Sequence, residues 1–167
     1  MLELRKLEPD DWPLWRELRL AALGQAPEAF GARLADWQGA GDREERWRAR
    51  LAIPGGRDVV AFLDDEPVGM VSGVPGTRAD TVELISMWVA PRARGRGVGD
   101  ALIEAIKQWA RGRDATTLRL SVMPDNPAAL GLYQRHGFSD TGEPGVLRRD
   151  GLTRERVLAV PLSQGVS

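Results

Sequence analysis

The stretch Thr81–Ala110, TVELISMWVAPRARGRGVGDALIEAIKQWA, decides the fold of this chain. Its first part, Leu84–Val89, is rich in β-branched and large apolar residues. Pro91, which cannot donate to a sheet ladder, closes it, so this part predicts a strand. From Val98 onward, apolar residues recur with the i, i+3, i+4, i+7 spacing of a helix that buries one face. A strand that runs through a short turn into a helix places backbone N–H groups side by side at the turn.

The turn between strand and helix, RARGRGVG, has the chemistry of an anion-binding site. Gly95, Gly97 and Gly99 leave the backbone bare, although glycine inside an element costs about 0.5–1 kcal/mol relative to alanine. Such a cluster at a helix start indicates a tight turn or the close approach of a ligand. The first N–H groups of a helix have no acceptor within it, and the helix dipole adds about half a positive charge there. The neighbouring arginines carry the same sign.

Composition bounds the class of protein. The chain has 167 residues, of which 43% are hydrophobic, a length and composition that fit one globular domain over 1–167. The net charge of −1 gives no basic field for nucleic acid or an anionic membrane. No run approaches the roughly 18 apolar residues of a membrane span, and the N-terminus lacks the apolar run of a signal peptide. With no cysteine and His136 as the one histidine, we expect a cytoplasmic protein without a metal site.

The rest of the chain predicts an α/β (α+β) domain with a mixed, mostly antiparallel sheet of about seven strands and about four helices. The first half supplies strands in meander order, and the long central helix leads to a parallel crossover. The segment from Gln25 to Ala40 mixes glycine, proline and aromatic residues, which is typical of a connection. The predicted strands are 2–7, 59–63, 68–74, 84–89, 116–122, 138–143 and 154–162, and the predicted helices are 10–24, 42–51, 98–110 and 127–136.

Two common phosphate-binding loops do not fit the turn. The dinucleotide pattern GxGxxG fails in both frames, because its last position falls on Asp100 or on Leu102. A Walker loop needs Lys and then Ser or Thr after its last glycine, and Asp100 and Ala101 follow Gly99 instead. What remains is a shorter anion-binding pattern, RxxGxG, at the start of a helix.

This pattern resembles a known signature. Arg94–Gly99 is similar to the acetyl-CoA motif (Q/R)xxGx(G/A) of the GNAT superfamily of N-acetyltransferases, and Asn126–Phe138, NxxAxxLYxxxGF, is similar to the second motif of that superfamily. The order of strands and helices agrees over nearly the whole chain. The resemblance implies a single acetyl-CoA-binding N-acetyltransferase domain over 1–167. It also implies a V-shaped splay between the fourth and fifth strands, where acetyl-CoA lies.

The resemblance further implies how acetyl-CoA is held, without a metal. The backbone N–H groups of the glycine turn would bind the diphosphate, and the exposed backbone at the end of the fourth strand would pair with the pantetheine amides. The residues assigned to acetyl-CoA in this way are Met87, Trp88, Val89, Arg94, Gly95, Arg96, Gly97, Val98, Gly99 and Asn126. A solvated arginine and a helix-capping asparagine are the alternative roles of Arg94 and Asn126.

The reaction implied is direct attack of a primary amine on the thioester in a ternary complex. An amine with a pKa of about 10 must lose a proton, and the departing thiolate gains from a nearby proton donor. Tyr133, the one tyrosine, stands where the family places that donor, and Glu83 stands near where it often places a glutamate as base. A buried ring and a surface carboxylate are the alternatives, and Ser86 or Ser121 could position a water.

The acceptor is not identified by these residues. A small-molecule amine and a peptide amine both remain open, as does a homodimer. By the resemblance, the first two helices and their connection would roof the acceptor site, with Phe30, Trp37 and Trp47 available for its wall. A non-catalytic acyl-CoA-binding or sensing module is the alternative function, and Tyr133 argues against it.

Overall fold

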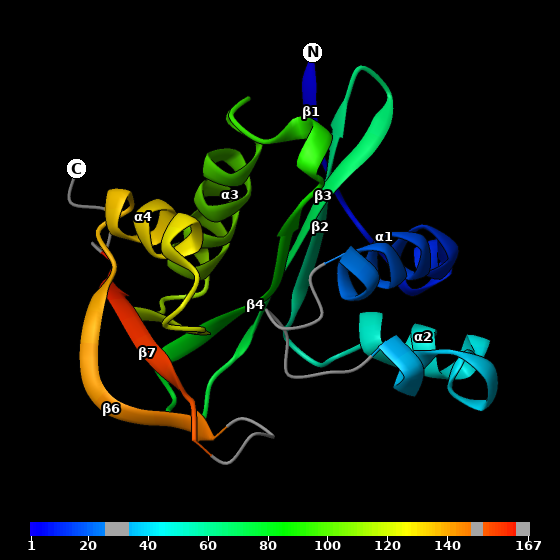
Figure 1. The fold of residues 1–167 in the computed structure, drawn as a ribbon. Coiled ribbons are helices and arrows are strands. Elements are labelled where there is room, and N and C mark those ends of the chain that lie inside the picture. Colours follow the sequence, from blue (N-terminus) through cyan, green and yellow to red (C-terminus); the bar gives the residue numbers. More distant parts are fainter. Residues whose placement is uncertain (26–33, 148–151, 163–167) are drawn as a thin grey trace.

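A computed structural model describes residues 1–25, 34–147 and 152–162 (Figure 1). It contains a seven-stranded sheet with the strand order β1-β2-β3-β4-β5-β7-β6. The strands are β1 Leu2–Lys6, β2 Arg57–Leu63, β3 Glu66–Pro75, β4 Thr81–Val89, β5 Thr117–Val122, β6 Ser139–Leu147 and β7 Arg154–Pro161, and the helices are α1 Trp12–Gln25, α2 Glu44–Leu51, α3 Val98–Gly112 and α4 Pro127–Arg135.

The topology confirms the predicted meander and crossover. Strands β1 to β4 pair antiparallel in chain order, β4 and β5 pair parallel across α3, and β7 pairs antiparallel with both β5 and β6. Most boundaries lie within a few residues of those predicted. The largest differences are that β4 begins at Thr81 and that β6 extends to Leu147, because both ends find ladder partners that the apolar pattern does not reveal.

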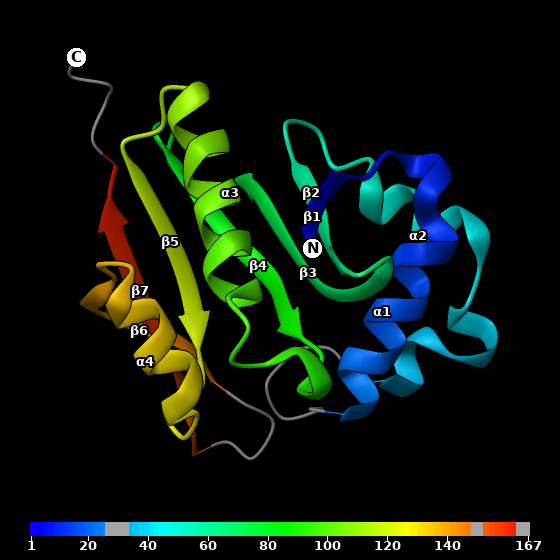
Figure 2. The same ribbon diagram turned by 90° about the horizontal axis from the view of Figure 1, so that it is seen from above.

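The helices cover both faces of the sheet (Figures 1 and 2). Helices α3 and α4 lie on one face, and α1 and α2 lie on the other. Between α1 and α2, the described part of the connection forms short 3₁₀ turns at Leu34–Trp37 and Gly39–Gly41. The sheet therefore separates a face under α3 and α4 from a face under α1 and α2.

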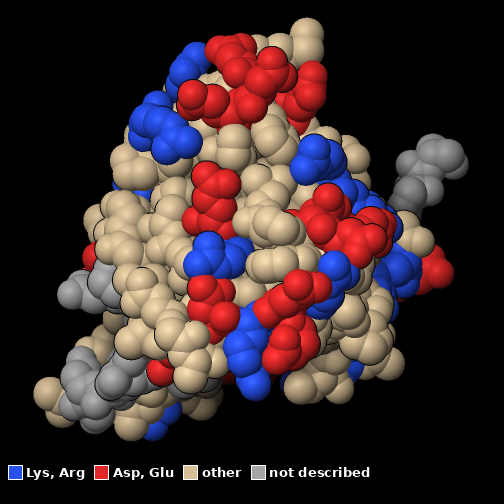
Figure 3. Space-filling view, turned by 90° about the vertical axis from the view of Figure 1, so that its right-hand side faces the viewer, with Lys and Arg blue, Asp and Glu red and all other residues tan. Residues whose placement is uncertain are grey.

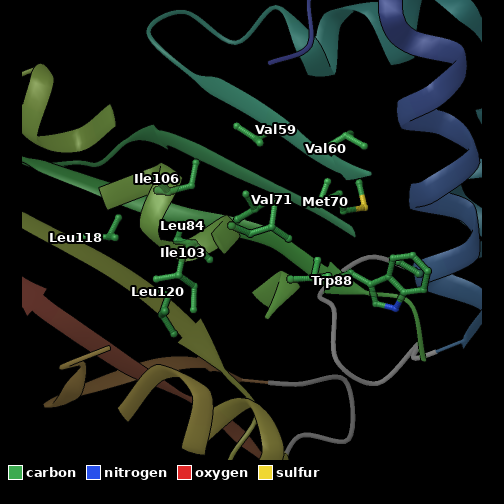
Figure 4. Close-up of a cluster of buried hydrophobic side chains, with 14 of the residues drawn as sticks. Val59, Val60, Met70, Val71, Leu84, Trp88, Ile103, Ile106, Leu118 and Leu120 are labelled. Atoms are coloured by element: carbon green, nitrogen blue, oxygen red, sulfur yellow. The ribbon is translucent and has the colours of Figure 1, made fainter. Parts of the chain in front are cut away.

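The core is built from both sides of the central strands (Figure 4). Ile106 of α3 is fully buried, as the helical spacing predicts, and Ile103, which the predicted face did not include, is fully buried as well. Leu118 of β5 is buried with them. On the other face, Trp15 of α1 and Trp47 of α2 have no exposed surface. Burying a large apolar side chain contributes about 1.5–3 kcal/mol, so both layers stabilise the sheet.

The strands β4 and β5 separate after a short paired segment. Thr81–Glu83 pairs with Thr117–Arg119, while β4 continues to Val89 and β5 to Val122. The predicted splay between the fourth and fifth strands is confirmed, and it opens toward the carboxyl ends of both strands.

A β-bulge lies in β4 where the two strands diverge. Ser72 of β3 faces Ile85, whereas Met70 of β3 faces Trp88, so one residue of β3 stands opposite two residues of β4. The first of those two, Ser86, has a φ of +56°. A bulge increases local twist and turns the chain, and here it changes the direction of β4 just before its last residues.

Candidate active site

A cavity of about 560 Å³ opens where β4 and β5 diverge. Three segments line it: the end of β4 (Met87, Trp88 and Val89), the turn into α3 from Ala93 to Asp100, in which Arg96 is not a lining residue, and parts of 126–135 around α4. This volume lies within the roughly 300–1,000 Å³ of small-molecule sites. Both sequence motifs therefore contribute to one cavity.

The start of α3 supplies backbone donors to this cavity. Gly97 is the N-cap residue with a φ of +80°, and Gly95 has a φ of +78°, a left-handed conformation that residues with a Cβ rarely adopt. The first helical hydrogen bond runs from Ala101 N to Gly97 O at 3.1 Å. The preceding N–H groups, up to Asp100, therefore have no acceptor within the helix. Together with the helix dipole, they fit a diphosphate.

The third glycine of the turn has a different role from the other two. A Cβ at Gly99 would lie 3.1 Å from Leu132 Cδ2 and 3.6 Å from Met87 Cε, whereas open space surrounds the same positions at Gly95 and Gly97. Gly99 thus allows α3 to approach α4 closely, and Gly95 and Gly97 are required for their backbone conformation.

The arginines of the turn point in different directions. Arg94 lines the cavity, where its Nε donates to Val89 O at 3.2 Å. Arg92 turns toward the β2–β3 hairpin and donates to Pro67 O at 3.1 Å. The RxxGxG pattern does not predict which arginine points into the cavity, because the direction of each side chain depends on the backbone conformation of the turn.

Tyr133 of α4 places a phenol in the apolar wall of the cavity. Its side chain is 7% exposed, and its ring packs edge-on against Phe138 with 5.7 Å between centroids. Burial raises the pKa of Tyr133, because the phenolate is penalised more than the phenol in these surroundings. Tyr133 therefore keeps its proton at neutral pH and can donate it in a hydrogen bond.

Asn126 caps α4 and also lines the cavity. Its side-chain oxygen accepts a hydrogen bond from Ala129 N at 3.2 Å, and Pro127 follows at the first helical position, as the sequence predicts. The cap holds the start of α4 beside the last residues of β4.

An ionic cluster beside the cavity was missed by sequence reasoning. Asp100 and Arg135 both line the cavity, and Asp100 Oδ1 lies 2.7 Å from His136 Nε2 and 3.3 Å from Arg135 Nη2. Its hydrogen bond to His136, followed by that to Arg135, lowers the pKa of Asp100. Only the fold brings α3 and the end of α4 together, so no local pattern in the sequence could have paired Asp100 with His136 and Arg135.

Glu83 lies away from this cavity. It pairs in register with Val74 of β3 and Arg119 of β5, at the beginning of β4. Val74 lies two residues from Ser72, which contacts Arg50 of α2, so Glu83 belongs to the face of the sheet under α1 and α2. Among the described residues, Tyr133 lines the cavity and Glu83 does not.

Two of the three aromatic residues predicted for an acceptor wall, Trp37 and Trp47, lie among the described residues. Trp47 is completely buried, and its indole donates to Asp42 Oδ1 at 2.8 Å, so it belongs to the core. The Trp37 ring packs against Trp47 at an interplanar angle of 36°, with 4.5 Å between ring centroids, and the Arg46 guanidinium lies 3.6 Å from the Trp37 centroid. Phe30 lies outside the described residues.

Acidic and basic side chains are interspersed on the side of the molecule that carries α1 and α2 (Figure 3). Arg48 of α2, for example, pairs with Asp10 at 2.6 Å and with Glu44 at 2.8 Å.

Within the described ranges, no group of three metal-ligating side chains is found. No helix in those ranges is long and apolar enough to cross a membrane.

Comparison with known proteins identifies the family. Residues 7–138 match the model of the acetyltransferase (GNAT) family, and the chain belongs to this family. It is 30% identical over 122 residues to L-2,4-diaminobutyric acid acetyltransferase from Nocardia farcinica. That alignment covers 66% of this chain and 62% of the relative, so the chain spans less than two thirds of the relative's length.

Solved structures share the fold over nearly the whole chain. A GNAT-family acetyltransferase from Streptococcus pneumoniae has a TM-score of 0.79 at 22% identity and covers 98% of this chain and 100% of its own. The PaiA N-acetyltransferase from Thermoplasma acidophilum, solved in complex with coenzyme A, has a TM-score of 0.74 at 16% identity, with coverage of 96% and 99%. At these identities the likeness concerns the fold.

Proposed function

We propose that the chain is an acetyl-CoA-dependent N-acetyltransferase domain that transfers the acetyl group to a primary amine. One observation carries this proposal: a buried phenol, Tyr133, lines the same cavity as the donor-rich start of α3. A site that only bound an acyl-CoA would need the backbone donors but not the phenol. The family membership and the acetyltransferase relatives support the same function.

Acetyl-CoA would supply an activated acetyl group, its thioester. The N–H groups at the start of α3 would bind the diphosphate, and Arg94 would add a positive charge beside it. The backbone of Met87–Val89, beyond the bulge, would pair with the pantetheine amides, and Asn126 would contact the same arm. Arg96 does not line the cavity, and it would contribute only a backbone N–H of the same turn.

A protonated amine loses two protons, one before it attacks the thioester and one as the amide forms; the leaving sulfur takes up one proton, and the other passes to solvent. We propose that Tyr133 donates to the leaving sulfur, because its buried phenol stays protonated. Glu83, on the face under α1 and α2, is our proposed base for the amine, acting through water. This arrangement places the acceptor and the diphosphate on opposite sides of β4, so the amine would reach the thioester through the opening between β4 and β5.

An amine screen tests the proposal. Acetyl-CoA and the protein are incubated with diamino acids, polyamines, aminoglycosides and peptides that carry a free N-terminus, and free thiol is measured. We expect thiol release that depends on at least one class of amine, together with the acetylated amine by mass spectrometry. Tight binding of acetyl-CoA without thiol release for any amine would instead favour a non-catalytic binding or sensing module.

A further inference from the structure

Ser86 of β4 has a backbone conformation that its residue type disfavours. Its φ of +56° lies in the left-handed region, where a Cβ is unfavourable and where a bulge of this kind usually takes glycine. Such a residue keeps its conformation only when its surroundings impose it, and conformations of this type gather at functional sites. The contacts of its side chain show what imposes it here.

Arg50, in the last turn of α2, holds Ser86 from the face under α1 and α2. Its Nη2 donates to Ser86 Oγ at 3.0 Å and to Ser72 Oγ at 3.0 Å. Its Nη1 donates to Asp58 Oδ1 at 3.1 Å, and Ser72 Oγ donates to the same carboxylate oxygen. One guanidinium therefore ties β2, β3 and the bulge of β4 together.

The surroundings of Arg50 make these hydrogen bonds strong. Ser72 has no exposed surface, Asp58 is 6% exposed, and the Arg50 guanidinium lies 5.0 Å from the ring centroid of the buried Trp15. The side chains of Arg50 and Asp58 are only 15% and 7% exposed, and this burial lowers the pKa of Arg50 and raises the pKa of Asp58. Water competes little with hydrogen bonds between such groups, so these hydrogen bonds keep a fixed geometry.

The residues that follow Ser86 along β4 are Met87, Trp88 and Val89, and all of them line the cavity. We infer that Arg50 is a positioning residue for the cosubstrate: by holding Ser86 in the left-handed conformation, it directs Met87–Val89 toward the cavity from the opposite face of the sheet. The inference rests on the proposed function, since it takes this cavity as the acetyl-CoA site.

The test separates positioning from simple support of α2. Arg50→Met alone would leave Asp58 buried without its cation, so the first variant is Arg50→Met combined with Asp58→Asn. Into this pair we introduce Ser86→Gly, because glycine adopts a positive φ without help. Ser121→Gly is the matched control, a serine of the neighbouring strand β5 that lacks a positive φ.

Binding of coenzyme A is measured by titration calorimetry. We expect the pair variant to lose about tenfold in affinity and Ser86→Gly to restore it to within about twofold, whereas Ser121→Gly restores nothing. If the pair variant binds as tightly as the parent, or if Ser86→Gly fails to restore its affinity, the inference is overturned. In the latter case Arg50 would serve only to attach α2.

Amide hydrogen exchange provides a readout without ligand. In the pair variant, exchange should accelerate at Met87–Val89 relative to Thr81–Leu84 of the same strand, and Ser86→Gly should reverse that change. Equal acceleration along the whole strand would contradict a local effect of Arg50. A parent protein that binds no coenzyme A would contradict the proposed function alone, because the exchange measurement still decides the role of Arg50.

Discussion

At the scale of single residues, the environment of a side chain decides which chemistry it can supply. Tyr133 is surrounded by apolar groups and keeps its proton, whereas the hydrogen bonds of Asp100 with His136 and Arg135 lower its pKa and favour its ionised form. Both residues line the same cavity. A proton donor and a fixed negative charge thus occur in one cavity because burial dominates at one position and hydrogen bonding at the other.

Replacement of Tyr133 by phenylalanine should separate chemistry from binding. Phenylalanine keeps the ring that packs on Phe138 and removes only the hydroxyl, so we expect the free energy of unfolding to change by less than about 1 kcal/mol. Loss of the proton donor should lower kcat by about 10²-fold, while KM for acetyl-CoA stays within about twofold. Steady-state kinetics with an amine found in the screen measures both, and an unchanged kcat would remove Tyr133 from the mechanism.

Glu83→Gln tests the proposed base. If the Glu83 carboxylate accepts the proton of the amine, this substitution should lower kcat/KM by about 10²-fold and change the pKa that the pH profile of kcat/KM shows on its rising limb. Glu3→Gln, at an exposed position of β1, is a control for the loss of one carboxylate. A Glu83→Gln enzyme that retains the parent's pH profile would leave a water held by serine as the alternative.

At the scale of elements, the start of α3 depends on backbone conformation more than on side chains. Gly97→Ala places a Cβ on a residue with a φ of +80°, where no neighbouring atom lies within 4 Å, so its effect comes from the backbone alone. We expect acetyl-CoA affinity to fall by about tenfold, since a turn that relaxes toward negative φ misdirects the N–H groups.

Gly112→Ala is the matched control for this prediction. Gly112 is the last residue of the same helix, has open space around its Cβ position and lacks a positive φ. Its acetyl-CoA affinity should equal that of the parent by calorimetry. Equal losses in both variants would show that helix stability, rather than the geometry of the turn, governs binding.

One carboxylate, Asp42, links a side chain of α1 with a side chain of α2. It accepts from Arg16 Nε at 2.7 Å and from Trp47 Nε1 at 2.8 Å. The hydrogen bond from Arg16, and then that from Trp47, lowers the pKa of Asp42 from its usual 3.8 to about 2. Because the folded state holds the ionised form, the stability that Asp42 contributes is complete above about pH 4 and is lost as the pH falls toward 2.

Asp42→Asn should therefore be less stable than the parent at pH 7, and the difference should shrink between about pH 4 and about pH 2.5. Urea unfolding at several pH values measures this difference directly. Glu17→Gln removes an exposed carboxylate from α1 and should show no such pH dependence. A difference for Asp42→Asn that stays constant over this range would mean that the charge of Asp42 does not matter.

At the scale of the whole molecule, the sequence predicted most of the fold and the part of the site that lies in local motifs. The alternation of apolar and polar residues in the strands and the helical spacing of apolar residues in α3 indicate which face of an element is buried. Asn126 and Pro127 mark the start of α4. These signals are local, so they can be read from one segment at a time.

Two polar contacts near the cavity that escaped prediction join segments distant in the chain. Arg50 meets Ser86 only because α2 packs over the bulge, and His136 meets Asp100 only because α4 lies beside α3. The positive φ of Ser86 had no signal at all, since serine is not the residue that such a position favours. Long-range polar contacts depend on how the elements pack, and the periodicity of apolar residues within one element does not predict that packing.

Packing between layers also depends on a residue without a side chain. Gly73 of β3 lies under Trp109 of α3, where an added Cβ would stand only 2.7 Å from Trp109 Cε3. Gly73→Ala must therefore push α3 away from the sheet, and we expect a loss of about 1–3 kcal/mol in the free energy of unfolding. Gly131→Ala, in α4 with open space at its Cβ position, should instead be neutral or slightly stabilising.

A second substitution shows whether this loss comes from the contact with Trp109. Trp109→Leu removes the ring and makes room for the added methyl group of the Gly73→Ala variant. The double variant should therefore lose less stability than the sum of the two single variants, with a coupling of about 1–2 kcal/mol. Urea unfolding of the parent, the two single variants and the double variant gives that coupling. Strictly additive losses would mean that the Gly73→Ala substitution disturbs β3 itself, and that the distance between α3 and the sheet is set by other contacts.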